Sequence, residues 1–188
     1  VDENNAEYSN DERGVLFNKD KTTLIRYPIG NTATSYDIPL SVTSIGDSAF
    51  GGCSRLASVA IPTSVVNIGS FAFSGCTNLK SVYITDLAAW CKIKFSKDGS
   101  NPLCHGGNLY IDGEKATNIE IPDGVASIGN YAFYGCNLTS VTIPEGVTSI
   151  GDYAFRNCSR LTSVTLPTSL TSIGSFCFSG SGLKDIYY

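Results

Sequence analysis

The sequence predicts an α/β repeat protein whose chain winds into a right-handed solenoid, rich in β-strand and with short helical turns. One observation is a phrase of 22 to 23 residues, I-P-x-x-V-x-x-I-G-x-x-A-F-x-x-C-x-x-L-x-x-V-x, which recurs along the 188-residue chain. A fixed period in this range is typical of solenoids. The other observation is that the phrase is too short to bury its own apolar residues, so successive units must stack and share one elongated core.

Prolines mark the register of the repeat. They follow an aliphatic residue at Pro39, Pro62, Pro122, Pro144 and Pro167. Counted from the residue before each of these prolines, residues 1–188 form a single domain of seven coils, of which 1–37 and 85–120 are longer and irregular. The chain has no methionine, and it starts and ends at the same point of the repeat. We therefore expect it to be a segment of a longer protein.

Each regular coil has three parts. The segment L-x-S-V-x-I, as at 79–84, alternates apolar and polar residues, which predicts a strand that the following proline ends. The segment V-x-x-I-G predicts a second extended piece, closed by a glycine that can adopt positive φ. The A-F-x-x-C stretch has room for one tight helical turn. We expect the stacked strands to form one parallel sheet along one face.

Equivalent side chains should form ladders through the core. The phenylalanine ladder comprises Phe50, Phe73, Phe133, Phe155 and Phe178. The leucine ladder comprises Leu56, Leu79, Leu138, Leu161 and Leu183. A third ladder comprises Cys53, Cys76, Cys136 and Cys158, and we expect these thiols to be buried and reduced, because stacked side chains that point the same way fit disulfide torsions poorly. Cys91 and Cys104 are the only pair with the freedom to form a disulfide.

The irregular coils contain local signals of their own. Asp86 can cap a short helical turn at 87–91. The dipeptide Asp112-Gly113 predicts a hairpin. In the first coil, a polar turn at 18–22 is flanked by two short extended pieces.

Composition argues against several classes of function. Thirteen basic and seventeen acidic residues give a net charge of −4, and no basic cluster occurs, so we expect no nucleic-acid partner. The apolar runs are only a few residues long, so this segment should not insert into a membrane. There is no phosphate-binding loop and no dinucleotide fingerprint, and we expect no cofactor.

Catalytic and metal-binding constellations are also missing. The only histidine, His105, directly follows Cys104, but sequence neighbours rarely face each other and no third group orients the pair. Cys91, Cys104 and His105 lack the paired C-x-x-C spacing and the fourth ligand of a zinc site. We expect no enzyme and no metal site.

The outward positions of the predicted sheet are the candidate binding surface. They are polar and rich in Ser and Thr, with Tyr83 and Tyr187 as large anchors, and solenoid sheet faces commonly bind partners. The candidate partner-binding residues are Ser81, Tyr83, Asn118, Glu120, Thr142, Thr165, Asp185 and Tyr187. The irregular segment 85–120 is a second candidate. The alternative is that Ser and Thr only make a well-solvated strand face.

Aromatic residues precede the repeat alanine in most coils. They are Phe71, Tyr131, Tyr153 and Phe176. Such rings could stack on sugars, but packing over the turns of neighbouring coils is the favoured interpretation.

The phrases IPEGVTSIGDYAF at 143–155 and CSRLTSVTLP at 158–167 closely resemble the BspA-like branch of the leucine-rich-repeat proteins. The likeness covers the whole chain, including the irregular stretches 14–28 and 86–91. The resemblance implies a leucine-rich-repeat solenoid of a secreted or cell-surface protein, mostly bacterial, that acts as an adhesin or binds host matrix or plasma proteins. It supplies no catalytic motif.

Two classes of function stay open. One is a non-enzymatic surface module that binds host or cell-envelope proteins or glycans. The other is a structural spacer that presents another domain of a larger surface protein, because a repeat scaffold alone does not specify a partner.

Overall fold

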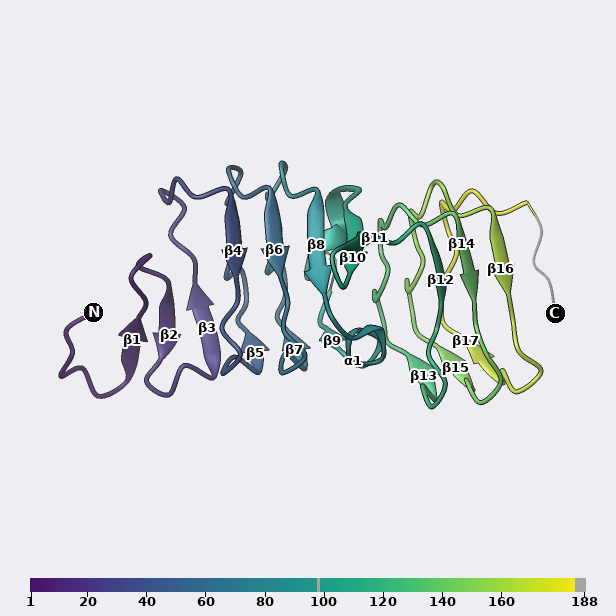
Figure 1. Ribbon diagram of the computed structural model, residues 1–188, viewed down its shortest axis with the longest axis horizontal. Helices are drawn as coiled ribbons and strands as arrows, with labels where there is room; N and C mark the ends of the chain where they lie inside the picture. The colour runs from purple at the N-terminus through teal and green to yellow at the C-terminus, as the bar shows by residue number, and fades with distance from the viewer. Residues whose placement is uncertain (98, 185–188) are drawn as a thin grey trace.

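The repeat folds as a stack of coils. The computed structural model describes residues 1–97 and 99–184, which form an elongated β-solenoid of about seven turns with very little helix (Figure 1). Strands β1 to β3 lie at one end of the stack and β16 and β17 at the other (Figure 1). The right-handed sense of the winding stays a prediction.

The alternating segment of each coil forms the first strand face. The strands of its first sheet are β4 (Ser35–Asp37), β6 (Ser58–Ala60), β8 (Ser81–Ile84) and β10 (Asn108–Ile111), which pair in parallel, and β11 (Glu114–Lys115), which is antiparallel to β10. The strands of its second sheet are β12 (Asn118–Glu120), β14 (Ser140–Thr142) and β16 (Ser163–Thr165), all parallel. The middle residue of a three-residue strand, such as Val59 or Val141, is buried in the core, and its two neighbours point outward.

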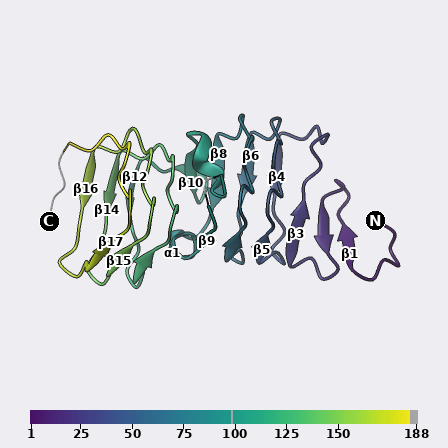
Figure 2. The same cartoon turned by 180° about the vertical axis from the view of Figure 1, so that it is seen from behind.

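The V-x-x-I-G segments, together with one strand of the irregular coil, form a second strand face, so the single sheet expected from the sequence is replaced by two strand faces. The strands are β5 (Ser44–Ile45), β7 (Asn67–Ile68) and β9 (Lys94–Phe95), and then β13 (Ser127–Ile128), β15 (Ser149–Ile150) and β17 (Ser172–Ile173). Stacking brings the backbones of successive coils within hydrogen-bonding reach on this side too, and buried amide groups need such partners. Figure 2 shows the strands of this face from behind.

The A-F-x-x-C stretch forms tight turns instead of a helix. The residue before the alanine has positive φ, for example 58° at Phe71 and 59° at Tyr153, which interrupts helical geometry. The freed amide groups bond between coils, as in Phe50 N donating to the Ala72 carbonyl oxygen over 2.8 Å. Backbone hydrogen bonds therefore connect the coils on a third side as well.

The irregular middle coil contains the local structures that its sequence predicts. Asp86 caps the N-terminus of helix α1 (Leu87–Cys91), and its side chain accepts a hydrogen bond from Ala89 N over 3.0 Å. A short 3-10 helix, η1, spans Pro102–His105. Strands β10 and β11 form the predicted hairpin, with φ of 50° at Asp112 and 85° at Gly113.

The first coil is an antiparallel meander. Its strands are β1 (Tyr8–Asn10), β2 (Leu16–Asn18) and β3 (Thr23–Arg26), and β3 pairs in parallel with β5. The turn expected at 18–22 joins β2 to β3.

The ladder residues lie in one core, as predicted, and the phenylalanine rings form two stacked runs on either side of the irregular coil. The ring centroids of Phe50 and Phe73 lie 4.8 Å apart, and those of Phe133 and Phe155 5.1 Å apart, with nearly parallel planes. All four rings are fully buried. None of the seven cysteines is in a disulfide, and the four ladder cysteines are buried, as predicted. The thiols of Cys53, Cys76 and Cys158 donate to backbone carbonyl oxygens, for example Cys76 Sγ to the Phe50 oxygen over 3.0 Å.

Candidate functional site

The structure places the predicted site residues on two separate sheets. Ser81 and Tyr83 lie on β8 of the first sheet, and Asn118 and Glu120 lie on β12 of the second. Thr142 and Thr165 follow on β14 and β16. Asp185 and Tyr187 lie outside the described residues. Tyr83 differs from the others in lining a groove.

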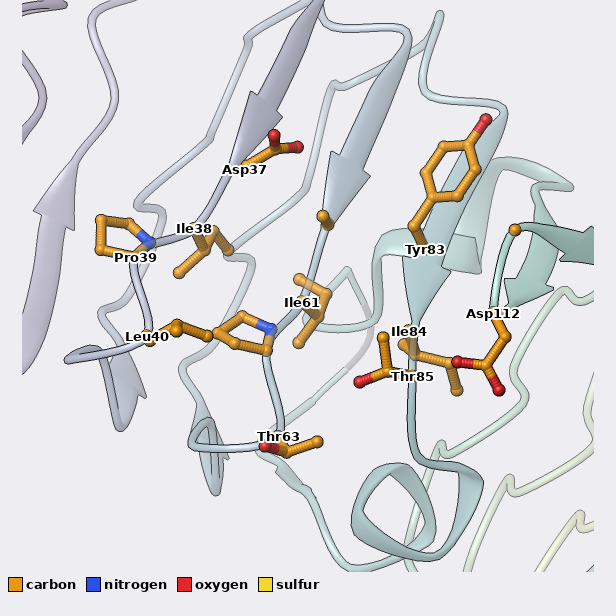
Figure 3. A pocket seen from close by; sticks show the side chains of 13 residues that line it. Asp37, Ile38, Pro39, Leu40, Ile61, Thr63, Tyr83, Ile84, Thr85 and Asp112 are labelled. Carbon is orange, nitrogen blue, oxygen red and sulfur yellow. The ribbon is translucent and has the colours of Figure 1, made fainter.

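The groove crosses the ends of β4, β6 and β8, where the chain leaves the sheet (Figure 3). It has a volume of about 490 Å³. Its floor contains Ile38, Ile61 and Ile84, which are 4 to 5% exposed. The turn at Asp112-Gly113 closes one end, so the irregular coil contributes to the groove.

Side-chain size along one row of the sheet creates the hollow. Asp37, Ala60, Tyr83 and Tyr110 are direct neighbours on four consecutive strands. Adjacent strands are about 4.8 Å apart, so Asp37 and Tyr83 stand roughly 10 Å apart. The methyl group of Ala60 leaves the space between them empty. Beyond the row, the prolines turn the backbone away because proline cannot continue a strand ladder.

Tyr83 is held in place by an aromatic neighbour. Its ring stacks on that of Tyr110, with centroids 4.7 Å apart and an angle of 25° between the planes. Tyr83 lines the groove whereas Tyr110 does not, so the ring face of Tyr83 that is not stacked is the one toward β6. A ring fixed in this way loses little freedom when a ligand packs against it.

The charged residues that line the groove are both acidic. Asp37 and Asp112 lie at opposite ends of it (Figure 3). Within the described part of the chain, neither carboxylate has a hydrogen bond or an ion pair. No lysine or arginine is among the described lining residues. The groove therefore combines an apolar floor with unneutralised negative charge.

Leu40 adds apolar surface at the rim. Its side chain is 81% exposed, a large fraction for a leucine. The equivalent residues of the other coils are Thr63, Asp123, Glu145 and Thr168. This departure from the repeat is a signal in the sequence that could have indicated the groove and was missed.

Three of the four aromatic residues before the repeat alanine pack on one another, as favoured from the sequence, whereas the side chain of Phe71 is 50% exposed. Tyr131 and Tyr153 stack with centroids 4.9 Å apart, and Tyr153 and Phe176 with centroids 5.5 Å apart. The Arg156 guanidinium lies 5.2 Å from the Tyr153 ring centroid. Because neighbouring rings cover each other's faces, Tyr131 and Tyr153 offer little ring surface to a sugar, whereas Phe176 at the end of the stack is 62% exposed.

A family model for the BspA type leucine rich repeat region matches this chain in six copies, over residues 30–97 and 108–188. The chain belongs to the BspA-type leucine-rich repeat family. The expectation drawn from the repeat phrases is thereby confirmed. A search of curated proteins gave no match.

Solved structures of bacterial proteins share the fold. A leucine-rich repeat protein from Eubacterium ventriosum is 29% identical with a TM-score of 0.61, and the similarity covers 98% of this chain and 52% of that one. A leucine rich cell surface protein from Faecalibacterium prausnitzii is 27% identical with a TM-score of 0.56, and the similarity covers 98% of this chain and 55% of that one. The pneumococcal vaccine antigen PcpA is 21% identical with a TM-score of 0.55, and the similarity covers 92% of this chain and 38% of that one. At this identity the similarity shows a shared fold alone. The chain thus spans about half the length of the first two relatives and less than half the length of PcpA.

Leucine-rich repeats of this kind are generally non-enzymatic. In this chain, burial raises the pKa of the Cys91 thiol to about 12, far above the pKa of a reactive cysteine thiol. His105 Nε2 lies 3.3 Å from the Phe73 carbonyl oxygen. Among residues 1–97 and 99–184, no three Cys, His, Asp or Glu side chains are grouped to hold a metal ion. No helix in those same ranges is both long and apolar enough to cross a bilayer.

Proposed function

We propose that this chain is a non-enzymatic binding module of a secreted or cell-surface bacterial protein, and that it binds host or cell-envelope proteins. The observation that carries the proposal is the groove beside Tyr83, which joins exposed apolar surface to a fixed aromatic ring. Leucine-rich repeats generally mediate protein interactions. The cell-surface description of the Faecalibacterium prausnitzii relative supports the same location for this chain.

The proposed contact surface begins at the groove and continues along the first strand face. Ser81 lies on the same strand as Tyr83, and its side chain is half-buried. Asn118 and Glu120 are exposed on the first strand of the second sheet. Thr142 and Thr165 form the outer part of this surface. A protein ligand is favoured over a glycan, because the apolar floor of the groove suits an aliphatic side chain and because Tyr131 and Tyr153 cover each other's ring faces.

A spacer is the second candidate function. The outward row of the second sheet reads Glu120, Thr142 and Thr165, with no aromatic or large aliphatic anchor. Backbone hydrogen bonds join the coils on three sides, which suits a stiff rod. A module can serve both functions if only its first half binds.

Paired tryptophan substitutions test the proposal. Ala60→Trp fills the groove, and Thr142→Trp places the same side chain on the central strand of the second sheet. The variants and the wild-type protein are compared by surface plasmon resonance on purified host matrix and plasma proteins and on a glycan array. Loss of binding by Ala60→Trp alone assigns binding to the groove. Loss by both variants extends the site over the whole face, and absence of any bound ligand leaves the spacer function.

A further inference from the structure

We propose that the groove binds an extended peptide segment of its partner with the pattern cation-x-aliphatic-x-cation, where each cation is lysine or arginine. This inference rests on the proposed binding function and names the chemistry of the partner.

Charge is the first argument. The Asp37 and Asp112 carboxylates lie at the two ends of the groove and have no partner among the described residues. The adjoining hollow that shares Asp37 is also lined by Arg13 and Lys21. Arg13 donates to the Ser35 carbonyl oxygen over 3.0 Å and lies 5.8 Å from the Tyr36 ring centroid, and within the described residues neither cation forms an ion pair with Asp37. A positively charged ligand therefore finds complementary charge at both ends, whereas an acidic one is repelled.

The floor between the two carboxylates selects an aliphatic side chain. Ala60, Ile61 and Pro62 lie there and present apolar atoms, and Leu40 extends this surface at the rim. The free ring face of Tyr83 lies beside the floor and can also attract a lysine or arginine through a cation–π contact. The centre of the groove thus favours an apolar residue with a cation next to it.

The spacing of the carboxylates sets the spacing of the cations. Asp37 ends β4 and Asp112 follows β10, three strand intervals away, so the two are on the order of 15 Å apart. An extended peptide advances about 3.4 Å per residue and returns to the same face every second residue. The four steps from residue i to residue i+4 therefore cover about 14 Å, and residues i, i+2 and i+4 point toward the groove. Residues i and i+4 meet the carboxylates, and residue i+2 meets the floor.

Three capped synthetic peptides probe the pattern. The first is Lys-Ser-Leu-Ser-Lys, the second has the same composition in the order Lys-Lys-Ser-Ser-Leu, and the third is Glu-Ser-Leu-Ser-Glu. Each is titrated at low salt into the ¹⁵N-labelled full chain and followed by NMR chemical shifts. We expect the first peptide to bind at least roughly fivefold more tightly than the second, with shifts around Ala60, Thr63 and Tyr83, and the third to bind weakest. Raising the salt to about 0.5 M should weaken the first peptide, because exposed charge pairs are screened.

Matched charge variants provide the control. Asp37→Asn and Asp112→Asn remove the two charges, and asparagine keeps the positive φ that position 112 requires. Asp123→Asn removes an exposed carboxylate in the second half of the chain. The first two variants should each weaken binding of Lys-Ser-Leu-Ser-Lys about three- to tenfold, and Asp123→Asn should leave it unchanged.

Equal binding of the three peptides, or equal effects of the three Asp→Asn variants, would overturn the proposed pattern. If these results were obtained while Ala60→Trp still blocked a matrix or plasma protein, the binding function would stand and only the peptide chemistry would be wrong.

Discussion

The two halves of the first strand face have the same backbone and different surfaces. In the first half the outward row reads Asp37, Ala60 and Tyr83, and in the second half it reads Glu120, Thr142 and Thr165. Both rows begin with a carboxylate and occupy equivalent positions of the repeat. A small residue beside a large one produces the groove of the first half, whereas two threonines give an even surface. The side chains at a single repeat position therefore create the hollow, and the turn of the irregular coil at Asp112-Gly113 closes one end of it.

Core truncation is the change with the largest expected effect, and it should affect both halves equally. Phe73→Ala and Phe155→Ala each remove a fully buried ring at the same repeat position of one core. We expect a loss of about 3 to 5 kcal/mol of unfolding free energy in either case, because the cavity cannot close completely. Denaturant unfolding followed by circular dichroism measures it. A cost below about 1 kcal/mol in one half would show that the halves do not share one core.

Alkaline pH should destabilise both halves through the cysteine ladder. Burial raises the pKa of the Cys76 thiol in the first half and of the Cys136 thiol in the second to about 12, from an ordinary value of 9.0. A raised pKa means that the folded protein holds the proton more tightly than the unfolded chain does. The stabilisation is therefore fully present below pH 9 and is progressively lost as the pH rises toward 12.

Unfolding midpoints measured in denaturant at several pH values between 8 and 11 test this prediction. Cys76→Ala and Cys136→Ala should each flatten the decline. A decline of the same slope in both variants would mean that other groups cause it.

Loss of the stacked ring behind Tyr83 should have the smallest effect and should be confined to the first half. Tyr110→Leu removes the stacking partner but keeps an apolar side chain beside the ring. We expect an affinity for Lys-Ser-Leu-Ser-Lys about two- to fivefold lower, since Tyr83 then has more freedom to lose on binding. Stability should change by less than about 1 kcal/mol. Unchanged affinity in the NMR titration would show that stacking on Tyr110 does not contribute to binding by restricting the Tyr83 ring.

Local chemistry explains which parts of the fold could be predicted from the sequence. The cap at Asp86 and the hairpin at Asp112-Gly113 depend on residues within a few positions of each other, and both are found as expected. The positive φ of Phe71 could not be predicted, because aromatic residues rarely adopt it. Contacts between coils stabilise that conformation, and residue propensities do not report such contacts.

The groove was missed for a related reason. The groove row consists of Asp37, Ala60 and Tyr83, and each is 23 residues from the next in the sequence. Their proximity follows only from the register of the strands. Tyr83 was a candidate because of its size, whereas Ala60 is important because it is small. Glu120 is a candidate from the sequence, and its role as a binding residue stays a prediction.

The most direct test converts the first row into the second. Ala60→Thr together with Tyr83→Thr gives the first half the row Asp-Thr-Thr, close to the Glu-Thr-Thr of the second half, with side chains that suit a strand. NMR titration of the double variant with Lys-Ser-Leu-Ser-Lys is compared with the wild-type titration, and thermal unfolding confirms that the fold is kept. We predict that the peptide-induced shifts disappear while the unfolding temperature stays within a few degrees. Undiminished shifts in a folded double variant would contradict the claim that these two side chains make the binding site.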